Sequence, residues 1–123
     1  MKPFLTLAII LGALITIMTD KQASASTATL ILDTTKGQIE IELKPDLAPN
    51  HVARISELAE EGYYDGIIFH RVIGGFMAQT GDPTGTGMGG SGQKLEAEFT
   101  DYQYREGTVG MARTMDPNSA DSQ

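Results

Sequence analysis

The sequence IIFHRVIGGFMAQTGD, residues 67–82, decides how the rest of this chain is interpreted. It carries one permanent cation, Arg71, close to an apolar pair, Phe76 and Met77, and to the side-chain amide of Gln79. Two successive glycines separate the cation from the apolar pair and allow a tight bend, because glycine adopts backbone angles that other residues avoid. The stretch therefore predicts a groove with an apolar seat beside a fixed positive charge.

Residues 1–25 have the pattern of a secretory signal. A basic start at Lys2 precedes an apolar run over residues 4–18, and the polar residues that follow lead to ASA at 23–25, an A-x-A cleavage site. The apolar run is shorter than the ~20 residues of a spanning helix. We therefore expect a signal peptide, residues 1–25, and one domain, residues 26–123. The protein would be periplasmic or otherwise extracytoplasmic, with no membrane association after cleavage; an uncleaved anchor is the alternative.

The predicted domain is strongly acidic. Without residues 1–25, which contain two lysines and one aspartate, the chain has seven basic and fifteen acidic residues and a net charge of −8. A negative surface is unsuited to nucleic acid or to anionic membranes as partners. The sequence has no cysteine, which excludes disulfides, thiolate metal sites and a cysteine nucleophile. Such a domain must be held together by its core alone.

Hydrophobic patterns predict six strands. Residues 38–43 alternate between polar and apolar, as is typical of a half-buried strand, and residues 28–34 are expected to pair with them across a turn at 35–37. The apolar run 30–32 in the first of these strands is expected to be mostly buried. The remaining strand candidates are residues 67–72, 76–80, 95–99 and 108–113.

One helix is expected between Pro49 and Gly62, because proline suits the first helical turn and glycine is typical of the stop. Residues 81–92 contain six glycines and are expected to form a mobile surface loop. Strands without a βαβ rhythm indicate a mainly β domain, an antiparallel sheet or barrel with the helix packed on it. Because no closing element precedes Gln123, we expect the sequence to be incomplete at its C-terminus.

Several other patterns favour structural roles over chemistry. GTGMGG at 85–90 fits the dinucleotide-binding spacing, but residues 91–94 do not begin the helix that this motif needs. His51 and His70 lack a recognised metal-ligand spacing, and no serine lies in a nucleophile elbow. Arg71 alone on a strand is more often a surface ion pair. We expect neither a metal nor a cofactor.

The motifs of this chain resemble the signature of cyclophilins, the peptidyl-prolyl cis-trans isomerases. The resemblance is carried by FHRVI at 69–73, GFM at 75–77, Gln79 and Gly81-Asp82. It extends in order from YYDG at 63–66 to the glycine loop, Glu98-Phe99, Gly110-Met111-Ala112 and Ser122-Gln123. It implies a closed antiparallel β-barrel with capping helices, of which this chain carries the N-terminal part, with one helix and about six strands. The signal peptide makes it similar to exported bacterial members.

The same resemblance implies roles for single residues. By this resemblance, Arg71 is the catalytic residue. The residues that would line the substrate groove are Phe76, Met77, Gln79, Ala112, Arg113 and Gln123. Gly74, Thr80 and Arg113 stand where the family often has proline, glycine and asparagine, which affects the expected substrate preference rather than the reaction. The implied partners are proline-containing unfolded or flexible polypeptides, bound by a monomer, and no metal or cofactor is implied.

An arginine suits this reaction because no covalent bond is made or broken. The prolyl nitrogen regains its lone pair as the peptide bond twists, and a guanidinium aimed at it binds the twisted state better than the planar one. The resemblance, together with the signal pattern of residues 1–25, therefore implies an exported peptidyl-prolyl isomerase that assists protein folding. Two alternatives stay open: a proline-peptide-binding chaperone module, and an inactive fragment with little catalysis.

Overall fold

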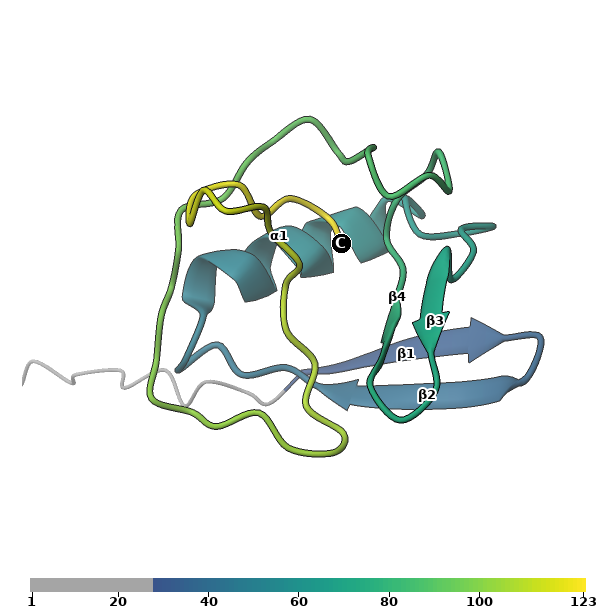
Figure 1. Cartoon of the computed structure of the whole chain (residues 1–123), viewed down its shortest axis with the longest axis horizontal. Coiled ribbons are helices and arrows are strands. Elements are labelled where there is room, and N and C mark those ends of the chain that lie inside the picture. The colour runs from purple at the N-terminus through teal and green to yellow at the C-terminus, as the bar shows by residue number, and fades with distance from the viewer. Residues whose placement is uncertain (1–27) are drawn as a thin grey trace, which may run out of the picture.

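The computed structural model describes residues 28–123 as one helix and four strands joined by long loops (Figure 1). The predicted signal peptide, its cleavage site and the first residues of the predicted domain lie outside these residues. No helix in residues 28–123 is long and apolar enough to cross a membrane. The elements, in order, are β1 (Thr29–Thr34), β2 (Gly37–Glu42), α1 (Pro49–Glu60), β3 (Arg71–Ile73) and β4 (Met77–Gln79).

The β1–β2 hairpin forms where the polar–apolar alternation predicts it. The strands pair antiparallel, and one face carries the apolar side chains of Leu30, Leu32, Ile39 and Ile41. The expectation that residues 30–32 are all mostly buried is wrong for Ile31, which is 52% exposed. Ile31 lies opposite Glu40, so the period-two alternation of a strand turns it to the polar face of the hairpin.

Helix α1 confirms the predicted helix, but its N-terminus is capped by a residue far away in the sequence. Ala48 occupies the N-cap position and has no side chain that could accept a backbone hydrogen bond. Glu98 replaces it: its carboxylate accepts from the backbone N–H of Asn50 at 3.1 Å and of His51 at 2.8 Å. A carboxylate at this end also interacts favourably with the helix dipole.

The β3–β4 hairpin is shorter than the sequence predicts. Its strands cover Arg71–Ile73 and Met77–Gln79, whereas the patterns favour residues 67–72 and 76–80. The predicted bend is confirmed, since the Phe76 N–H donates to the Ile73 carbonyl oxygen at 3.0 Å and Gly75 has a φ of +73°. Residues 67–70 form no strand, because they have no ladder partner among the described residues.

The two hairpins form separate sheets, and residues 28–123 do not close into a barrel. Residues 95–99 and 108–113 are not strands; in them only Leu95 pairs, with Ala120, in an isolated bridge. Phe99 is 72% exposed, so strand-favouring side chains alone do not make a strand without a neighbour to pack on. The described residues therefore contain two antiparallel hairpins and one helix, with four strands in place of the six expected and without the expected barrel closure.

Buried apolar side chains are few among the described residues: Leu58, Leu95 and Ala120 are 2%, 7% and 2% exposed. Ser122 is buried as well. Its hydroxyl donates to the Gly81 carbonyl oxygen at 2.8 Å, and its own carbonyl accepts from the Tyr64 hydroxyl at 3.0 Å. The C-terminal segment therefore lies near the end of α1 (Figure 1).

Candidate functional site

The β3–β4 hairpin brings the predicted cation and the predicted amide together. Arg71 lies directly opposite Gln79, and Ile73 lies opposite Met77. Directly opposed residues project to the same face of a sheet, so these four side chains share one face. Arg71 is exposed, and no carboxylate of residues 28–123 forms an ion pair with it. The ordinary alternative for Arg71, a surface ion pair, therefore has no partner in the described part of the chain.

Phe76 and Met77 supply apolar surface on the same hairpin. Phe76 closes the turn and is 75% exposed, while Met77 is half-buried at the start of β4. A phenylalanine this exposed adds little to a core, and its ring is free to contact an apolar ligand. The two predicted apolar residues thus lie on the same hairpin as the predicted cation, and Met77 shares its face.

Gln79 is held by a second glutamine from the C-terminal segment. Its Nε2 donates to Oε1 of Gln123 at 2.8 Å. The Nε2 of Gln123 in turn donates to the carbonyl oxygens of Gly89, at 2.7 Å, and Gly87, at 3.3 Å. The structure therefore brings two of the predicted groove residues into direct contact, although they are 44 positions apart.

Ala112 joins this cluster through its backbone, and Arg113 does not. The Ala112 N–H donates to the carbonyl oxygen of Gln123 at 2.8 Å. The Arg113 guanidinium lies 5.7 Å from the centre of the Phe99 ring, and its Nη1 donates to the Thr114 carbonyl at 2.8 Å. These contacts turn the Arg113 side chain toward its own segment rather than toward the pair of glutamines.

Asp82 is the central residue of the site that the sequence interpretation missed. The residue is fully buried, at 0% exposed. Its carboxylate accepts from the backbone N–H groups of Thr84 at 2.8 Å, Gly87 at 2.6 Å and Gly89 at 3.1 Å. The loop after Asp82 contains no helix or strand, as expected, but it is wrapped around this one side chain. An aspartate followed by threonines and glycines at alternating positions was the available signal, because such residues bond locally to a carboxylate.

The hydrogen bonds decide the ionisation of Asp82. Burial by itself raises the pKa of a carboxyl group, since it disfavours the charged form. The Thr84 side chain and the backbone N–H groups of Gly89, Thr84 and Gly87 outweigh burial and lower the pKa of Asp82 well below its usual value. The group is therefore a carboxylate, and so an acceptor only, at neutral pH.

A second carboxylate holds the end of the glycine loop. Asp121 accepts from the backbone N–H groups of Ser91 at 2.8 Å and Gly92 at 3.0 Å. The Ser91 hydroxyl also accepts from the Arg54 guanidinium of α1 at 3.1 Å. The loop is thus anchored at both ends, by Asp82 near its start and by Asp121 and α1 near its end.

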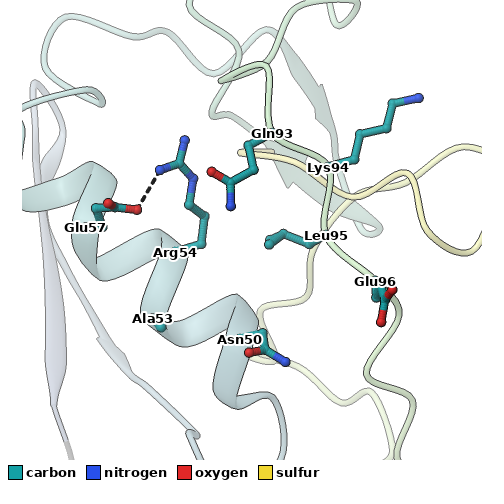
Figure 2. A pocket seen from close by; sticks show the side chains of 8 residues that line it. All are labelled: Asn50, Ala53, Arg54, Glu57, Gln93, Lys94, Leu95 and Glu96. Atoms are coloured by element: carbon teal, nitrogen blue, oxygen red, sulfur yellow. Dashed lines mark hydrogen bonds and ion pairs between the residues drawn. The ribbon is translucent and has the colours of Figure 1, made fainter.

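A pocket of about 650 Å³ lies between α1 and residues 93–96 (Figure 2). Its charged residues are Arg54, Glu57, Lys94 and Glu96, so the two signs balance. Arg54 points toward Glu57 and donates to it at 2.6 Å, and the Gln93 side chain projects toward the same region (Figure 2). None of the predicted site residues lines this pocket. Residues 28–123 also contain no cluster of three or more histidines and acidic residues able to hold a metal ion.

Residues 29–123 match the family model described as cyclophilin type peptidyl-prolyl cis-trans isomerase. The chain belongs to the cyclophilin family. This confirms the family that the motifs between residues 63 and 123 resemble.

Named relatives agree with this assignment. This cyclophilin is 50% identical over 107 residues to a probable peptidyl-prolyl cis-trans isomerase of Brucella suis, covering 77% of the chain and 55% of that protein. It is 49% identical over 82 residues to a peptidyl-prolyl cis-trans isomerase of Synechococcus elongatus, covering 67% of the chain and 57% of that protein. The chain thus spans little more than half the length of these relatives.

Solved structures show the same fold. A cyclophilin type peptidyl-prolyl cis-trans isomerase of Cryptosporidium parvum superposes with a TM-score of 0.70 at 32% sequence identity, covering 78% of this chain and 64% of that one. Its crystal structure in the presence of the dipeptide Ala-Pro gives a TM-score of 0.69. The arrangement of this cyclophilin's hairpins and helix is therefore that of part of the family fold.

Proposed function

We propose that this chain accelerates the cis–trans isomerisation of X-Pro bonds in flexible or unfolded polypeptides and so assists protein folding. The observation that carries the proposal is the β3–β4 face, on which Arg71 lies opposite Gln79 with Met77 beside them. Membership of the cyclophilin family supports the same reaction. Further support comes from the related Cryptosporidium protein, whose crystal structure was determined in the presence of the dipeptide Ala-Pro.

The reaction needs a catalyst because the peptide bond is stiff. Delocalisation of the nitrogen lone pair into the carbonyl gives a rotation barrier of ~18–20 kcal/mol. X-Pro bonds populate both isomers but exchange only over roughly tens to hundreds of seconds. An acceleration of ~10⁵ requires the barrier to fall by about 7 kcal/mol. The site must therefore bind the twisted bond considerably better than the planar one.

Arg71 supplies that difference. When the bond twists, conjugation is lost and the prolyl nitrogen becomes pyramidal and recovers its lone pair. A guanidinium N–H directed at this nitrogen is better satisfied in the twisted state than in either planar isomer, so the interaction is differential. Arginine is suited to the role because it stays protonated and its donors are held in a rigid plane.

The other predicted groove residues hold the substrate still. Phe76 and Met77 bury the proline ring, which fixes one side of the bond while the other side rotates. Gln79 binds the substrate backbone near the rotating carbonyl. Gln123 holds Gln79 through its side chain, and Ala112 holds the backbone of Gln123. Arg113 stands where asparagine is commoner in the family, and this change alters the choice of flanking residues.

The proposal extends to an exported protein that works outside the cytoplasm, in the periplasm, as a monomer. The support for export is the basic start, the apolar run and the A-x-A motif within residues 1–25. The support for a monomer is the net charge of −8 for residues 26–123, because like-charged molecules repel one another. The clients are proline-containing polypeptides that are not yet folded.

A protease-coupled assay with a short X-Pro peptide tests the proposal. Arg71→Ala should lower kcat/KM for isomerisation by ~10² or more, because it removes a charge that acts mainly on the twisted state. Arg105→Ala, which removes an exposed arginine elsewhere, is the matched control and should leave kcat/KM unchanged. Both variants should keep the wild-type far-UV CD spectrum.

Three results are informative against the proposal. Wild-type activity in Arg71→Ala would remove Arg71 from the mechanism. Equal losses in the Arg71 and Arg105 variants would point to general electrostatics. Binding of the proline peptide by the wild-type chain without any acceleration would favour the alternative of a peptide-binding module.

A further inference from the structure

A continuous series of hydrogen bonds connects the buried Asp82 to the amide that lies opposite Arg71. Asp82 accepts from the N–H groups of Gly87 and Gly89, at 2.6 Å and 3.1 Å. The carbonyl oxygens of these same two glycines accept from Nε2 of Gln123. Gln123 Oε1 then accepts from Nε2 of Gln79. No water or second chain is needed to complete the connection.

Two glycines transmit the position of the carboxylate because each is bonded on both sides. Gly87 and Gly89 donate inward to Asp82 and accept outward from Gln123, so the loop backbone that encloses the carboxylate also carries the two acceptors that hold the Gln123 amide. Gly89 also has no room for a side chain, since a Cβ would collide with Oδ1 of Asp82. The loop therefore closes on the carboxylate more tightly than any other residue at 89 would allow.

The series also has a direction, which fixes how both amides are turned. A carboxylate only accepts, so the loop must present N–H groups inward and carbonyl groups outward. Those carbonyls require the NH₂ end of Gln123, which leaves its Oε1 facing Gln79. Gln79 must therefore donate to this oxygen from its own NH₂ group. Its Oε1 and one remaining N–H are then left for other partners on the Arg71 face.

We propose that Asp82 is a positioning residue, which fixes the orientation of the Gln79 amide through the glycine loop and Gln123. Gln79 then presents its Oε1 as an acceptor for a substrate backbone N–H beside Arg71. The inference rests on the function proposed above. Without a carboxylate at 82, the carbonyls of Gly87 and Gly89 lose their fixed positions, and both glutamine amides are free to rotate.

The substitution Asp82→Asn tests this in the full chain, because it keeps the size of the side chain and replaces one acceptor oxygen by a donor. The first readout is the pair of side-chain amide signals of Gln79 and Gln123 in ¹H–¹⁵N spectra, which should shift. Asp116→Asn is the matched control: Asp116 is exposed, accepts from the Asn118 N–H at 2.9 Å, and has no link to Gln123. Its spectrum should keep both signals in place.

The second readout is a double-mutant cycle on isomerisation. Asp82→Asn should lower kcat/KM about tenfold in the wild-type background, as expected for a misplaced binding group. In the Gln123→Ala background, Asp82→Asn should lower kcat/KM by less than about twofold, because the hydrogen-bond connection to Gln79 is already broken. A merely destabilising effect of Asp82→Asn would instead be the same in both backgrounds.

The outcomes separate this inference from the proposed function. The positioning role of Asp82 would be overturned by unmoved Gln79 signals. It would also be overturned if Asp82→Asn lowered kcat/KM by the same factor in the wild-type and Gln123→Ala backgrounds. Absence of isomerisation in the wild-type chain would overturn the proposed function, while the amide signals still decide the positioning. If Asp82→Asn does not fold, Thr84→Val removes only the hydroxyl that donates to Asp82 at 2.8 Å and 3.0 Å. This variant should shift the Gln79 signals in the same direction by a smaller amount, and unmoved signals would count against the role.

Discussion

At the scale of single residues, three arginines carry the same charge but have different partners, and the partners show which of them is available to bind a substrate. Arg54 is bonded to Glu57 and Ser91. Arg113 lies over the Phe99 ring and bonds to a neighbouring carbonyl. Arg71 has no carboxylate partner within residues 28–123 and lies opposite an amide. Position in the sequence could not separate them without the family resemblance, because the partners of Arg54 and Arg113 come partly from other segments of the chain.

Phe76 allows binding to be separated from stability at this same scale. Because Phe76 is 75% exposed, Phe76→Ala should hardly change the free energy of unfolding. If the ring of a bound proline covers Phe76, the same change should weaken the affinity for a proline peptide about tenfold, equivalent to ~1.4 kcal/mol. Isothermal titration and urea unfolding measure the two effects. Met115→Ala, at a residue 97% exposed, is the control and should change neither. Lower stability with unchanged affinity would make Phe76 a structural residue.

At the scale of elements, the sequence predicts what is set by neighbours along the chain. The alternation in β2 and the proline at the start of α1 are local signals, and both elements form where expected. The strands expected at 95–99 and 108–113 do not form, because strand pairing depends on partners that local patterns do not contain. The cap of α1 is missed for the same reason, since Glu98 lies 48 residues from Asn50. Asp82 is missed although threonines and glycines follow it, because only the closed loop shows that the donors of Thr84, Gly87 and Gly89 all meet at one carboxylate.

The cap offers a test of how α1 is held. Glu98→Ala should lower the free energy of unfolding by about 1 kcal/mol, because two backbone N–H groups of the first helical turn lose their acceptor. Glu96→Ala is the matched control: it removes an equal charge nearby but leaves the Glu96 carbonyl that bonds to His51. Urea unfolding followed by CD at 222 nm measures both. Equal destabilisation by the two substitutions would show that charge, and not capping, is responsible.

At the scale of the whole molecule, one buried and two half-buried carboxylates connect segments that apolar packing leaves apart. Few apolar side chains are buried in the described residues, whereas thirteen large hydrophobic residues are exposed. Asp82 accepts hydrogen bonds from backbone N–H groups of the glycine loop, and Asp121 accepts from the far end of that loop. Glu98 accepts from the first turn of α1 and so connects its own segment to the helix. Asp82 is the acceptor among them whose pKa is lowered by its hydrogen bonds, because charge-assisted hydrogen bonds to the ionised form are stronger than neutral ones. The stability of the molecule should therefore depend on pH in the acid range.

Asp82 sets the direction of that dependence. Burial alone raises its pKa, but hydrogen bonds from Thr84, Gly89 and Gly87 lower the pKa of the folded state well below the ordinary value of ~3.9. A lowered folded-state pKa adds stability that is fully present above the ordinary pKa and is lost as the pH falls through the folded one. Wild-type protein should therefore be more stable than Asp82→Asn at neutral pH, and the gap should narrow below about pH 4. Urea midpoints of both proteins across this range measure the gap, with Asp116→Asn expected to follow the wild type. A gap that stays constant down to the acid transition would mean that Asp82 is held by packing rather than as an ionised acceptor.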